Sequence, residues 1–429
     1  MKINIDYIAR VEGEGSVKFE IKGGKLKELK LNIWEPPRFF EGFLVGRKYD
    51  EVPDIVSRIC GICPVSHMTT SIYAIEKAIG FTPSLEIKKI RRIMSLSQIA
   101  ASHLVHLYML ALPDYYKTEL LFSGRSNPPP SPFSKGGKEG LLNEINRLLR
   151  LKEAVNNVTA LFGGRPLHPV AMVVGGFTKV PSRDEIGRMI KQLEDIKEDA
   201  LETVKMISGL NYPDFKNSTE YVAIFNKNDY AINEGTITSS SGLRAEIDDY
   251  HSYFEEEEVS YSNAKRTVLK GKEPIMVGAL SRLNIKFDML HPEAKKAAEK
   301  IGFKILQKNP YLNNVAQAIE IVHGIWECIE LLDSLSIKDF FIKVNVKEGS
   351  GSAATEAPRG MLYHQYELNG RGIIERANIV TPTAYNFLSL EESLKKLVNE
   401  NIDKPVEELS LLCEMLVRAY DPCFSCSVH

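Results

Sequence analysis

The alternation of apolar and polar residues predicts a β-hairpin near the start of the chain. Apolar residues alternate with polar ones over residues 17–21 and again over 29–33, and Gly23 and Gly24 lie between the two runs. Alternation places every second side chain on one face of a strand, and glycine readily adopts the positive φ of a tight turn. The pattern therefore predicts two antiparallel strands joined at the glycine pair.

Helical patterns and helix-end signals dominate most of the rest. Ser182 and Glu185 have the spacing of a capping box, Gly209 is a stop signal for the helix that they open, and Pro405 suits a helix's first turn. Residues 221–261 have a mixed pattern that favours short strands over helices. Helices are predicted over residues 87–108, 182–209, 312–335 and 405–418.

One stretch, residues 123–140, departs from the globular pattern because it is dense in Pro, Gly and Ser. Such a segment buries little apolar surface and cannot maintain a helix or a sheet ladder. We expect it to be an exposed loop between two long helices. We predict one domain over residues 1–429, with an α+β, predominantly helical fold in which long helices surround a buried site.

Composition excludes several classes of partner. The chain has 429 residues, 44% of them hydrophobic and 26% charged, and a formal net charge of −2. This balance is typical of a soluble protein with a large core, and it gives no electrostatic reason to expect nucleic acid or an anionic membrane. No apolar run approaches the roughly 20 residues of a spanning helix, and the N-terminus lacks an apolar signal region. We expect a cytoplasmic protein without direct membrane insertion.

Four of the six cysteines form two CxxC pairs near opposite ends of the chain, Cys60 with Cys63 and Cys423 with Cys426. Each pair can direct two sulfurs at one point, which indicates a metal site. Spacing alone leaves a closed zinc site that joins the two ends as an equal alternative. The other two cysteines, Cys328 and Cys413, lie in apolar helical runs and are predicted to be buried core thiols. No disulfide framework is expected in a large chain with so few cysteines.

The residues that flank the two pairs narrow the choice. R-I-C-G-I-C-P-V-S-H at residues 58–67 and D-P-C-F-S-C-S-V-H at residues 421–429 resemble the signature pair of nickel–iron hydrogenase large subunits. Matching segments run along the chain: R-V-E-G (10–13), P-R-F-F-E (37–41), G-R-P-L-H-P (164–169), E-A-P-R-G (356–360) and T-P-T-A-Y-N (381–386). E-P-P-R-F-F-E at residues 35–41 is most similar to the soluble multimeric enzymes that exchange electrons with NAD(P) or sulfur.

The resemblance implies a nickel–iron centre that converts hydrogen reversibly to protons and electrons. By this resemblance all four cysteines bind nickel: Cys60 and Cys423 terminally, and Cys63 and Cys426 as bridges to an iron that also carries carbon monoxide and cyanide. Thiolates are soft ligands that suit both metals. A zinc-bound, non-catalytic scaffold subunit is the alternative function, and a non-catalytic relative in respiratory complex I is another, although that relative lacks the four cysteines.

Four further residues match the family's catalytic positions. Glu12 matches a glutamate that carries the proton away from Cys423, although a surface carboxylate at a strand end is the plainer interpretation of the residue alone. Arg359 matches an arginine above the open metal position, where a permanent charge could polarise hydrogen. Asp114 and Asp421 match the carboxylates that hold this arginine, although Asp114 could simply end a helix after a proline.

The resemblance also assigns the surroundings of the centre. Pro382 and Thr383 match the pocket wall and the hydroxyl that face the diatomic ligands. His67, four residues after Cys63, is expected to support the thiolates. His103 and His106 have an i, i+3 spacing that metals can use, but we interpret them as core histidines.

A second cation site is implied near the C-terminus. In the family, a magnesium-like ion is held by a glutamate, a backbone carbonyl and the terminal histidine, and these match Glu41, approximately Ile379, and His429. Oxygen-rich coordination is what magnesium prefers.

Electrons need a way out of the chain. Only two cysteines lie outside the metal site, and no strand–GxGxxG–helix segment is present to bind a nicotinamide or flavin. An iron–sulfur small subunit is therefore expected as partner. By subgroup resemblance, flavin and iron–sulfur subunits of the diaphorase type are expected beyond it.

Overall fold

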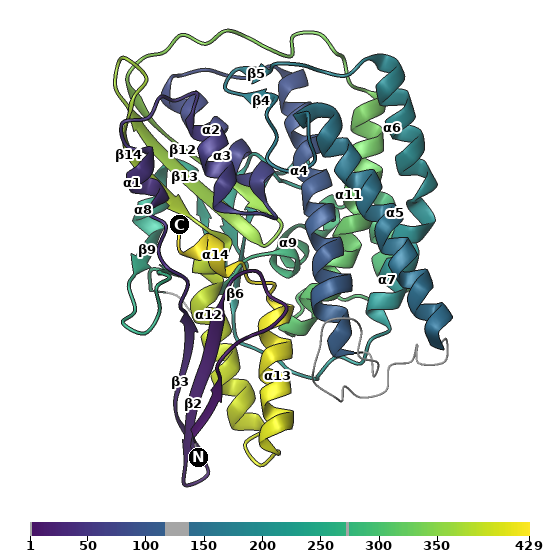
Figure 1. Ribbon diagram of the computed structural model, residues 1–429, viewed down its shortest axis with the longest axis vertical. Coiled ribbons are helices and arrows are strands. Elements are labelled where there is room, and N and C mark those ends of the chain that lie inside the picture. The colour runs from purple at the N-terminus through teal and green to yellow at the C-terminus, as the bar shows by residue number, and fades with distance from the viewer. Residues whose placement is uncertain (1, 116–136, 272–273) are drawn as a thin grey trace.

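The computed structural model describes residues 2–115, 137–271 and 274–429, and it places long helices on one side and small sheets on the other (Figure 1). The helices are α1 (Phe40–Leu44), α2 (Val52–Val56), α3 (Pro64–Ala78), α4 (Leu85–Val105), α5 (Gly137–Gly163), α6 (Arg183–Asp195), α7 (Lys197–Ser208), α8 (Tyr250–Tyr253), α9 (Ala279–Lys286), α10 (Pro292–Lys300), α11 (Asn313–Asp333), α12 (Pro382–Glu400), α13 (Val406–Ala419) and α14 (Phe424–Ser427). The fold is α+β and mainly helical, as predicted.

The strands form five small sheets in the described chain. They are β1 (Lys2–Ile5), β2 (Gly15–Lys22), β3 (Lys25–Ile33), β4 (Met172–Val173), β5 (Gly176–Phe177), β6 (Glu220–Phe225), β7 (Thr236–Ser239), β8 (Arg244–Ala245), β9 (Phe254–Glu257), β10 (Arg266–Leu269), β11 (Ile275–Met276), β12 (Gly349–Ala357), β13 (Gly360–Leu368) and β14 (Ile374–Val380). The sheet orders are β1-β2-β3, β4-β5, β11-β6-β7-β8, β10-β9 and β12-β13-β14. The short strands predicted over residues 221–261 are confirmed. This region also contains the brief helix α8, which was not predicted.

The predicted N-terminal hairpin is confirmed. Strands β2 and β3 pair antiparallel up to Lys22 and Lys25, and the two turn glycines have φ values of 57° and 68°. The sequence did not predict β1, which pairs with β2 and completes a sheet that projects from the body (Figure 1). Such a short run at the chain end carries too few alternating residues to be recognised.

The helical layer centres on α4, which packs against both α5 and α11. These helices confirm the predictions for residues 87–108 and 312–335, and α4 continues through a π-helical and a 3₁₀ turn to Asp114. The run Leu85–Asp114 is long and apolar enough for a membrane span by length and composition, which corrects the expectation that no run approaches that length. Its apolar window is 83% buried inside the protein, as in the core helix of a soluble protein.

Two predicted boundaries are wrong. The capping box at Ser182 is present, but its helix ends at Asp195, and α7 begins after a break at Ile196 (φ −102°, ψ 3°). Ile196 is buried, as a residue on the apolar face of a continuous helix would be. The spacing of apolar residues is the same for a straight helix and for a bent one, so the sequence pattern could not reveal the break. Pro405 precedes α13 as its N-cap instead of lying in its first turn; the helix itself is confirmed.

The predicted loop at 123–140 falls mostly on residues 123–136, which lie outside the described residues. Its last four residues, 137–140, belong to α5, so the predicted end of the loop is wrong. These four residues contain no proline, and nothing in them prevents the helix from extending to Gly137.

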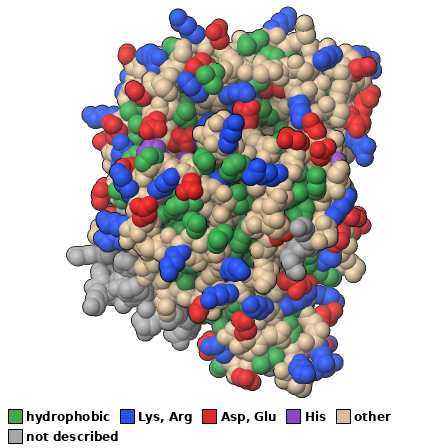
Figure 2. Space-filling view, turned by 180° about the vertical axis from the view of Figure 1, so that it is seen from behind, with side chains coloured by type: hydrophobic (Ala, Val, Ile, Leu, Met, Phe, Trp, Pro, Cys, Tyr) green, Lys and Arg blue, Asp and Glu red, His purple; other side chains and the backbone are tan. Residues whose placement is uncertain are grey.

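The segment after β1 and the C-terminal segment meet beside the layer formed by α3 and the β12-β13-β14 sheet, whereas β1 itself begins near the far tip of the β1-β2-β3 sheet (Figure 1). Cys63 is the N-cap of α3, Cys423 is the N-cap of α14, and Glu12 forms an isolated parallel bridge with Cys423. Helix α12 contacts α14, and its first turn begins at Pro382. Figure 2 shows the opposite face, where acidic and basic side chains are interspersed and form no large patch of one sign.

Candidate metal centre

The two CxxC pairs, separated by most of the sequence, come together in one buried cluster. The Sγ atoms of Cys60 and Cys423 are 3.6 Å apart, and those of Cys63 and Cys426 are 3.9 Å apart. All four residues are at most 5% exposed. Four sulfurs that face one another across a buried site form a donor set that suits soft transition metals.

Cys423 and Cys426 are joined as a disulfide within their CxxC turn, which the sequence did not predict. Their Cα atoms are 5.4 Å apart, a separation that such a bond requires. The other four cysteines are free and buried, as predicted for Cys328 and Cys413, and no bond joins distant segments. Only thiolates bind metal, so the disulfide must be reduced before these two sulfurs can act as ligands.

The N-terminal segment docks directly onto the second pair. The N–H of Phe424 donates to the carbonyl of Glu12 (2.8 Å). Gly13 has φ +86°, and a Cβ at this position would lie 2.6 Å from the backbone nitrogen of Ser425. Any side chain would therefore push the segment away from the cysteines, which explains why the R-V-E-G segment contains a glycine here.

Glu12 contacts the sulfur of Cys423. The Sγ–Oε2 distance is 2.8 Å, and the Ser425 hydroxyl donates to Oε1. A second carboxyl, Glu35, lies close by: burial and then the charge of Glu12 raise the pKa of Glu35 above its usual value. The two carboxyl groups are thus electrostatically coupled, and the first of them contacts a cysteine.

Arg359 is held by Asp421 on the same side of the cluster. Its Nε and Nη2 lie 3.1 and 2.9 Å from Oδ1 of Asp421, while Nη1 is buried without a hydrogen-bond partner. Burial alone lowers the pKa of Arg359, but Asp421 and then Cys60 and Cys63 raise it above its usual value. The guanidinium is therefore permanently charged, with one N–H group available to a group bound at the sulfurs.

Asp114 does not hold Arg359, which corrects the expectation from the resemblance. Its carboxylate accepts from Nε and Nη2 of Arg418 at 2.6 and 2.8 Å, and also pairs with Arg10. The aspartate follows a 3₁₀ turn at the end of the α4 run, which directs it at α13 and the N-terminal segment. Within the described residues, Asp421 is the one of these two aspartates that pairs with Arg359.

The first CxxC pair contains two thiols with different acidities. Burial raises the pKa of Cys60, but the hydrogen bond with Cys63, the charge of Arg359 and the N–H of Ile62 together lower it below its usual value. The Cys63 pKa is raised, first by that hydrogen bond and then by burial. Cys60 is therefore the sulfur of this pair that becomes a thiolate first.

A pair of histidines lies on the other side of the cluster. A ring nitrogen of His67 and the sulfurs of Cys63 and Cys426 all lie within 4.8 Å of one another. Nδ1 of His67 is 3.2 Å from Nε2 of His364, and Nδ1 of His364 is 2.7 Å from the Tyr366 hydroxyl. Burial, with smaller contributions from two cationic neighbours, lowers the pKa of His67 to about 3, so this imidazole stays neutral.

The other predicted residues of the site have definite partners. Thr383 accepts from the N–H of Cys423 (2.9 Å), and Pro382 is buried beside it at the start of α12. His103 contacts Glu320 (2.8 Å), and His106 bonds the backbone of Arg418 (2.7 Å), as expected of core histidines.

The three residues of the expected C-terminal cation site come together. Glu41 accepts from the N–H of Ile379 (2.6 Å), and Nε2 of His429 lies 2.7 Å from the Ile379 carbonyl. Nδ1 of His429 lies 2.7 Å from the carbonyl of Cys426. A carboxylate, a backbone carbonyl and an imidazole that lie together form a donor set that fits a cation.

Sequence reasoning missed three residues of the site. Arg38 donates to the carbonyls of Ile59 and Ser425 and thereby links both pairs. It lies in a matched motif, which could have identified it. No sequence signal identified Ser425 or His364, because their roles depend on contacts between segments that are far apart in the sequence.

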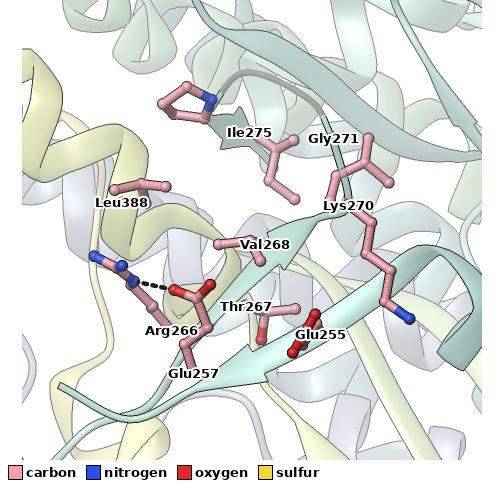
Figure 3. Close-up of a pocket in the computed structure, with 11 residues that line it drawn as sticks. Glu255, Glu257, Arg266, Thr267, Val268, Lys270, Gly271, Ile275 and Leu388 are labelled. Carbon is pink, nitrogen blue, oxygen red and sulfur yellow. Dashed lines mark hydrogen bonds and ion pairs between the residues drawn. The ribbon is translucent and has the colours of Figure 1, made fainter.

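The pocket in Figure 3, a cavity of about 360 Å³, is separate from this centre. It lies at the β9–β10 ribbon, where Arg266 pairs with Glu257 at 2.7 Å, and no cysteine or histidine lines it. It therefore offers no comparable metal chemistry.

Comparison with known proteins agrees with the geometry. A family model described as nickel-dependent hydrogenase matches residues 38–120 and 244–429, which include both CxxC pairs. Sulfhydrogenase 1 subunit alpha of Pyrococcus furiosus is 37% identical over 100% of this chain and 98% of its own, and sulfhydrogenase 2 subunit alpha of the same organism is 32% identical over 100% and 99%.

A solved NAD⁺-reducing [NiFe]-hydrogenase aligns over 100% of this chain and 99% of its own, with a TM-score of 0.87 and 25% identity. These matches favour a catalytic subunit over a zinc-bound scaffold. The chain belongs to the nickel-dependent hydrogenase family, as a catalytic large subunit.

Proposed function

We propose that the four sulfurs hold a nickel–iron centre, with Cys60 and Cys423 terminal on nickel and Cys63 and Cys426 shared with iron. The cluster of four buried sulfurs, at 3.6 and 3.9 Å across the two pairs, supports this arrangement. Carbon monoxide and cyanide on the iron belong to the proposal through the family resemblance. When bound, the metal pair supplies the Lewis-acid position at which hydrogen is polarised.

The contact between Cys423 and Glu12 is the observation that carries the proposed mechanism. Heterolytic cleavage of hydrogen releases a proton, which needs a base within hydrogen-bond reach. The Cys423 sulfur is that base, and Glu12 lies 2.8 Å from it, ready to accept the proton. Ser425 orients the other oxygen of Glu12. Glu35 is the next carboxyl, because its raised pKa lets it hold a proton more readily than an exposed glutamate.

Arg359 supplies charge to the same side. Its unpartnered Nη1 is free to donate to a ligand or to a polarised hydrogen, while Asp421 fixes the guanidinium from behind. A preoriented charge interacts much more strongly with a neighbouring group in a buried site than the same charge does in solvent. Thr383 and Pro382 form the wall next to Cys423.

The cluster of Glu41, the Ile379 carbonyl and His429 supports a proposed magnesium ion. His429 also contacts the carbonyl of Cys426, so a cation here would fix the last turn, which contains two of the proposed ligands. Its function is therefore to hold the C-terminal pair in place.

A partner that carries iron–sulfur clusters is needed for electrons to leave. Large apolar side chains are exposed beside the cysteines: Phe39 (72%), Phe43 (53%) and Val170 (54%). Phe39 follows Arg38, which contacts both CxxC segments, and Val170 follows His168, which bonds the carbonyl of Ser57 just before the first pair. An apolar surface at this place fits an iron–sulfur small subunit. Flavin-containing subunits that use NAD(P) or sulfur, and a cytoplasmic location, complete the proposal.

Purification of the full complex and of the isolated chain tests the proposal. The complex takes up hydrogen and reduces NAD(P) or sulfur, whereas the isolated chain reduces neither, because it has no route for electrons. Efficient NAD(P) reduction by the isolated chain, free of clusters, would contradict this account of its partners.

A further inference from the structure

Arg282 is a fully buried arginine that contacts the turn from which Arg359 projects. It lies on α9 and is 0% exposed. Ala357 at the end of β12 pairs with Gly360 at the start of β13, so Pro358 and Arg359 form a two-residue turn between the two strands. The backbone of this turn determines where the Arg359 side chain begins.

Every N–H group of Arg282 has an acceptor. Nε and Nη2 donate to the two carboxylate oxygens of Glu320, both at 2.6 Å. Nη1 donates to the carboxylate of Glu356 and to the carbonyl of Ala357, both at 3.0 Å. Nη2 also donates to the carbonyl of Pro358 at 3.1 Å. A guanidinium has five N–H donors in one plane, and these five contacts use all of them.

The five contacts connect the turn to a helix of the core. Glu320 lies on α11, and its two contacts fix the plane of the Arg282 guanidinium. The same plane presents Nη1 and Nη2 to the consecutive carbonyls of Ala357 and Pro358. A lysine has three donors on one nitrogen and cannot reproduce this pattern. One side chain therefore fixes the turn relative to α11.

The backbone of the turn also touches the segment that precedes α9. A Cβ on Gly278 would lie 3.1 Å from the carbonyl oxygen of Arg359, and a Cβ on Gly360 would lie 2.3 Å from Cγ2 of Val277. Both glycines have positive φ values, 118° and 130°. The turn therefore cannot move closer to this segment, and the hydrogen bonds of Arg282 prevent it from moving away.

Arg359 is thus held at two points. Asp421 pairs with its guanidinium, and Arg282 holds the two carbonyls that directly precede it in the chain. Nη1 of Arg359 has no hydrogen-bond partner of its own. The position of this free N–H group therefore depends on both supports.

We propose that Arg282 is a positioning residue that fixes the Pro358–Arg359 turn and thereby keeps the Arg359 guanidinium in place beside the sulfur cluster. This inference rests on the proposed function, because it requires Arg359 to act at the metal centre. Catalysis depends steeply on the placement of such a group. Arg282 acts only through Arg359, since all five of its own donors are used elsewhere.

A double-mutant cycle in the purified complex tests the inference, with turnover measured per bound nickel. Arg282→Lys keeps the positive charge but loses the planar set of donors, so we expect turnover to fall by about 10-fold. In a complex that already carries Arg359→Lys, the same change should lower turnover by less than about 2-fold, because the guanidinium that Arg282 positions is absent. A role in stability alone would give the same loss in both backgrounds.

Hydrogen–deuterium exchange gives a readout that does not depend on turnover. The backbone amides of Arg359 and Gly360 should exchange faster in Arg282→Lys than in the wild-type complex. The matched control is Arg91→Lys: Arg91 is also 0% exposed and pairs with both oxygens of Glu76, at 2.7 and 2.6 Å. We expect this control to leave exchange at the turn unchanged.

Glu320→Gln is a milder second variant, which carries the test if Arg282→Lys does not assemble. It leaves Arg282 in place but replaces one of the two oxygens that fix the guanidinium plane. We expect faster exchange at the turn and a smaller loss of turnover than in Arg282→Lys. This loss should also disappear in the Arg359→Lys background.

The possible outcomes separate this inference from the proposed function. If Arg359→Lys alone leaves turnover unchanged, the proposed role of Arg359 fails and the inference fails with it. If Arg359→Lys lowers turnover and Arg282→Lys causes an equal further loss in its presence, the inference alone is overturned. Unchanged exchange at the turn in the Arg282 and Glu320 variants would also overturn it. A loss that disappears in the Arg359→Lys background, together with faster exchange at the turn, supports it.

Discussion

The two sides of the sulfur cluster differ in charge. On the side of Cys60 and Cys423 lie the carboxylate of Glu12 and the guanidinium of Arg359 with its partner Asp421. On the side of Cys63 and Cys426 lies His67, in contact with another neutral imidazole. Both sides are buried, so solvent does not account for the difference.

This difference matches the chemistry that each side must perform. A cysteine that accepts a proton needs a base next to it and a charge that stabilises the thiolate. Under the proposed assignment, the sulfurs of Cys63 and Cys426 are the shared ligands, and His67 lies beside them. We infer that the charged side, with Glu12 and Arg359, handles protons. Five changes test this division, in order of decreasing expected effect.

Cys423→Ser should have the largest effect, because a hydroxyl is a poor ligand for nickel and a poor proton acceptor. We expect hydrogen uptake to be abolished. Cys413→Ser is the matched control, since Cys413 is an equally buried thiol outside the cluster. Substantial hydrogen uptake by a Cys423→Ser variant that contains nickel would show that Cys423 is not the proton acceptor.

Glu12→Gln preserves shape and removes proton affinity. We expect turnover to fall by about 100-fold or more, with metal content unchanged. Exchange of deuterium between hydrogen gas and water should fall in parallel, and Glu14→Gln, two residues away, should leave it intact. Normal exchange in the Glu12→Gln variant would place the proton route elsewhere.

Asp421→Asn and Asp114→Asn each remove one partner of a buried ion pair, so both should destabilise the fold. Asp421 also holds Arg359, so its change should in addition reduce the turnover of the folded fraction by about 10-fold. Asp114 pairs with Arg418 and Arg10, so its change should lower the free energy of unfolding by about 3–5 kcal/mol. Thermal unfolding and turnover of the folded fraction measure the two effects. A loss of turnover in Asp114→Asn but not in Asp421→Asn would show that Asp114 is the residue that supports Arg359.

The smallest effect is expected from a deletion in the Pro-, Gly- and Ser-rich segment. Replacing residues 123–136 with a short Gly/Ser link should change neither stability nor activity measurably, because a polar, proline-rich segment contributes little burial and a shorter loop is easier to close. Loss of partner binding or of folding would show that this segment makes a required contact.

The sequence predicted the components of the charged side well. Glu12, Arg359 and Asp421 lie in motifs that the resemblance matched, and the structure brings them to the cysteines. Glu41, Ile379 and His429 also meet as expected. Their roles in catalysis and in metal binding stay predictions.

Contacts that depend on the fold were beyond the sequence. His364 carried no signal, because only the pairing of β13 beside α3 places it behind His67. Arg282 is similar: its guanidinium bonds Glu320, Glu356 and the carbonyls of Ala357 and Pro358, and so supports the turn that carries Arg359. Asp114 was assigned to the wrong arginine because two buried arginines, 359 and 418, lie near the same site.

Metal analysis of the purified, reduced complex tests the central claim most directly. The account predicts nickel and iron in equal amounts at the large subunit, in addition to the iron of the partner's clusters, and their loss in Cys423→Ser. Zinc at the four cysteines, with no nickel in an otherwise intact complex, would contradict it.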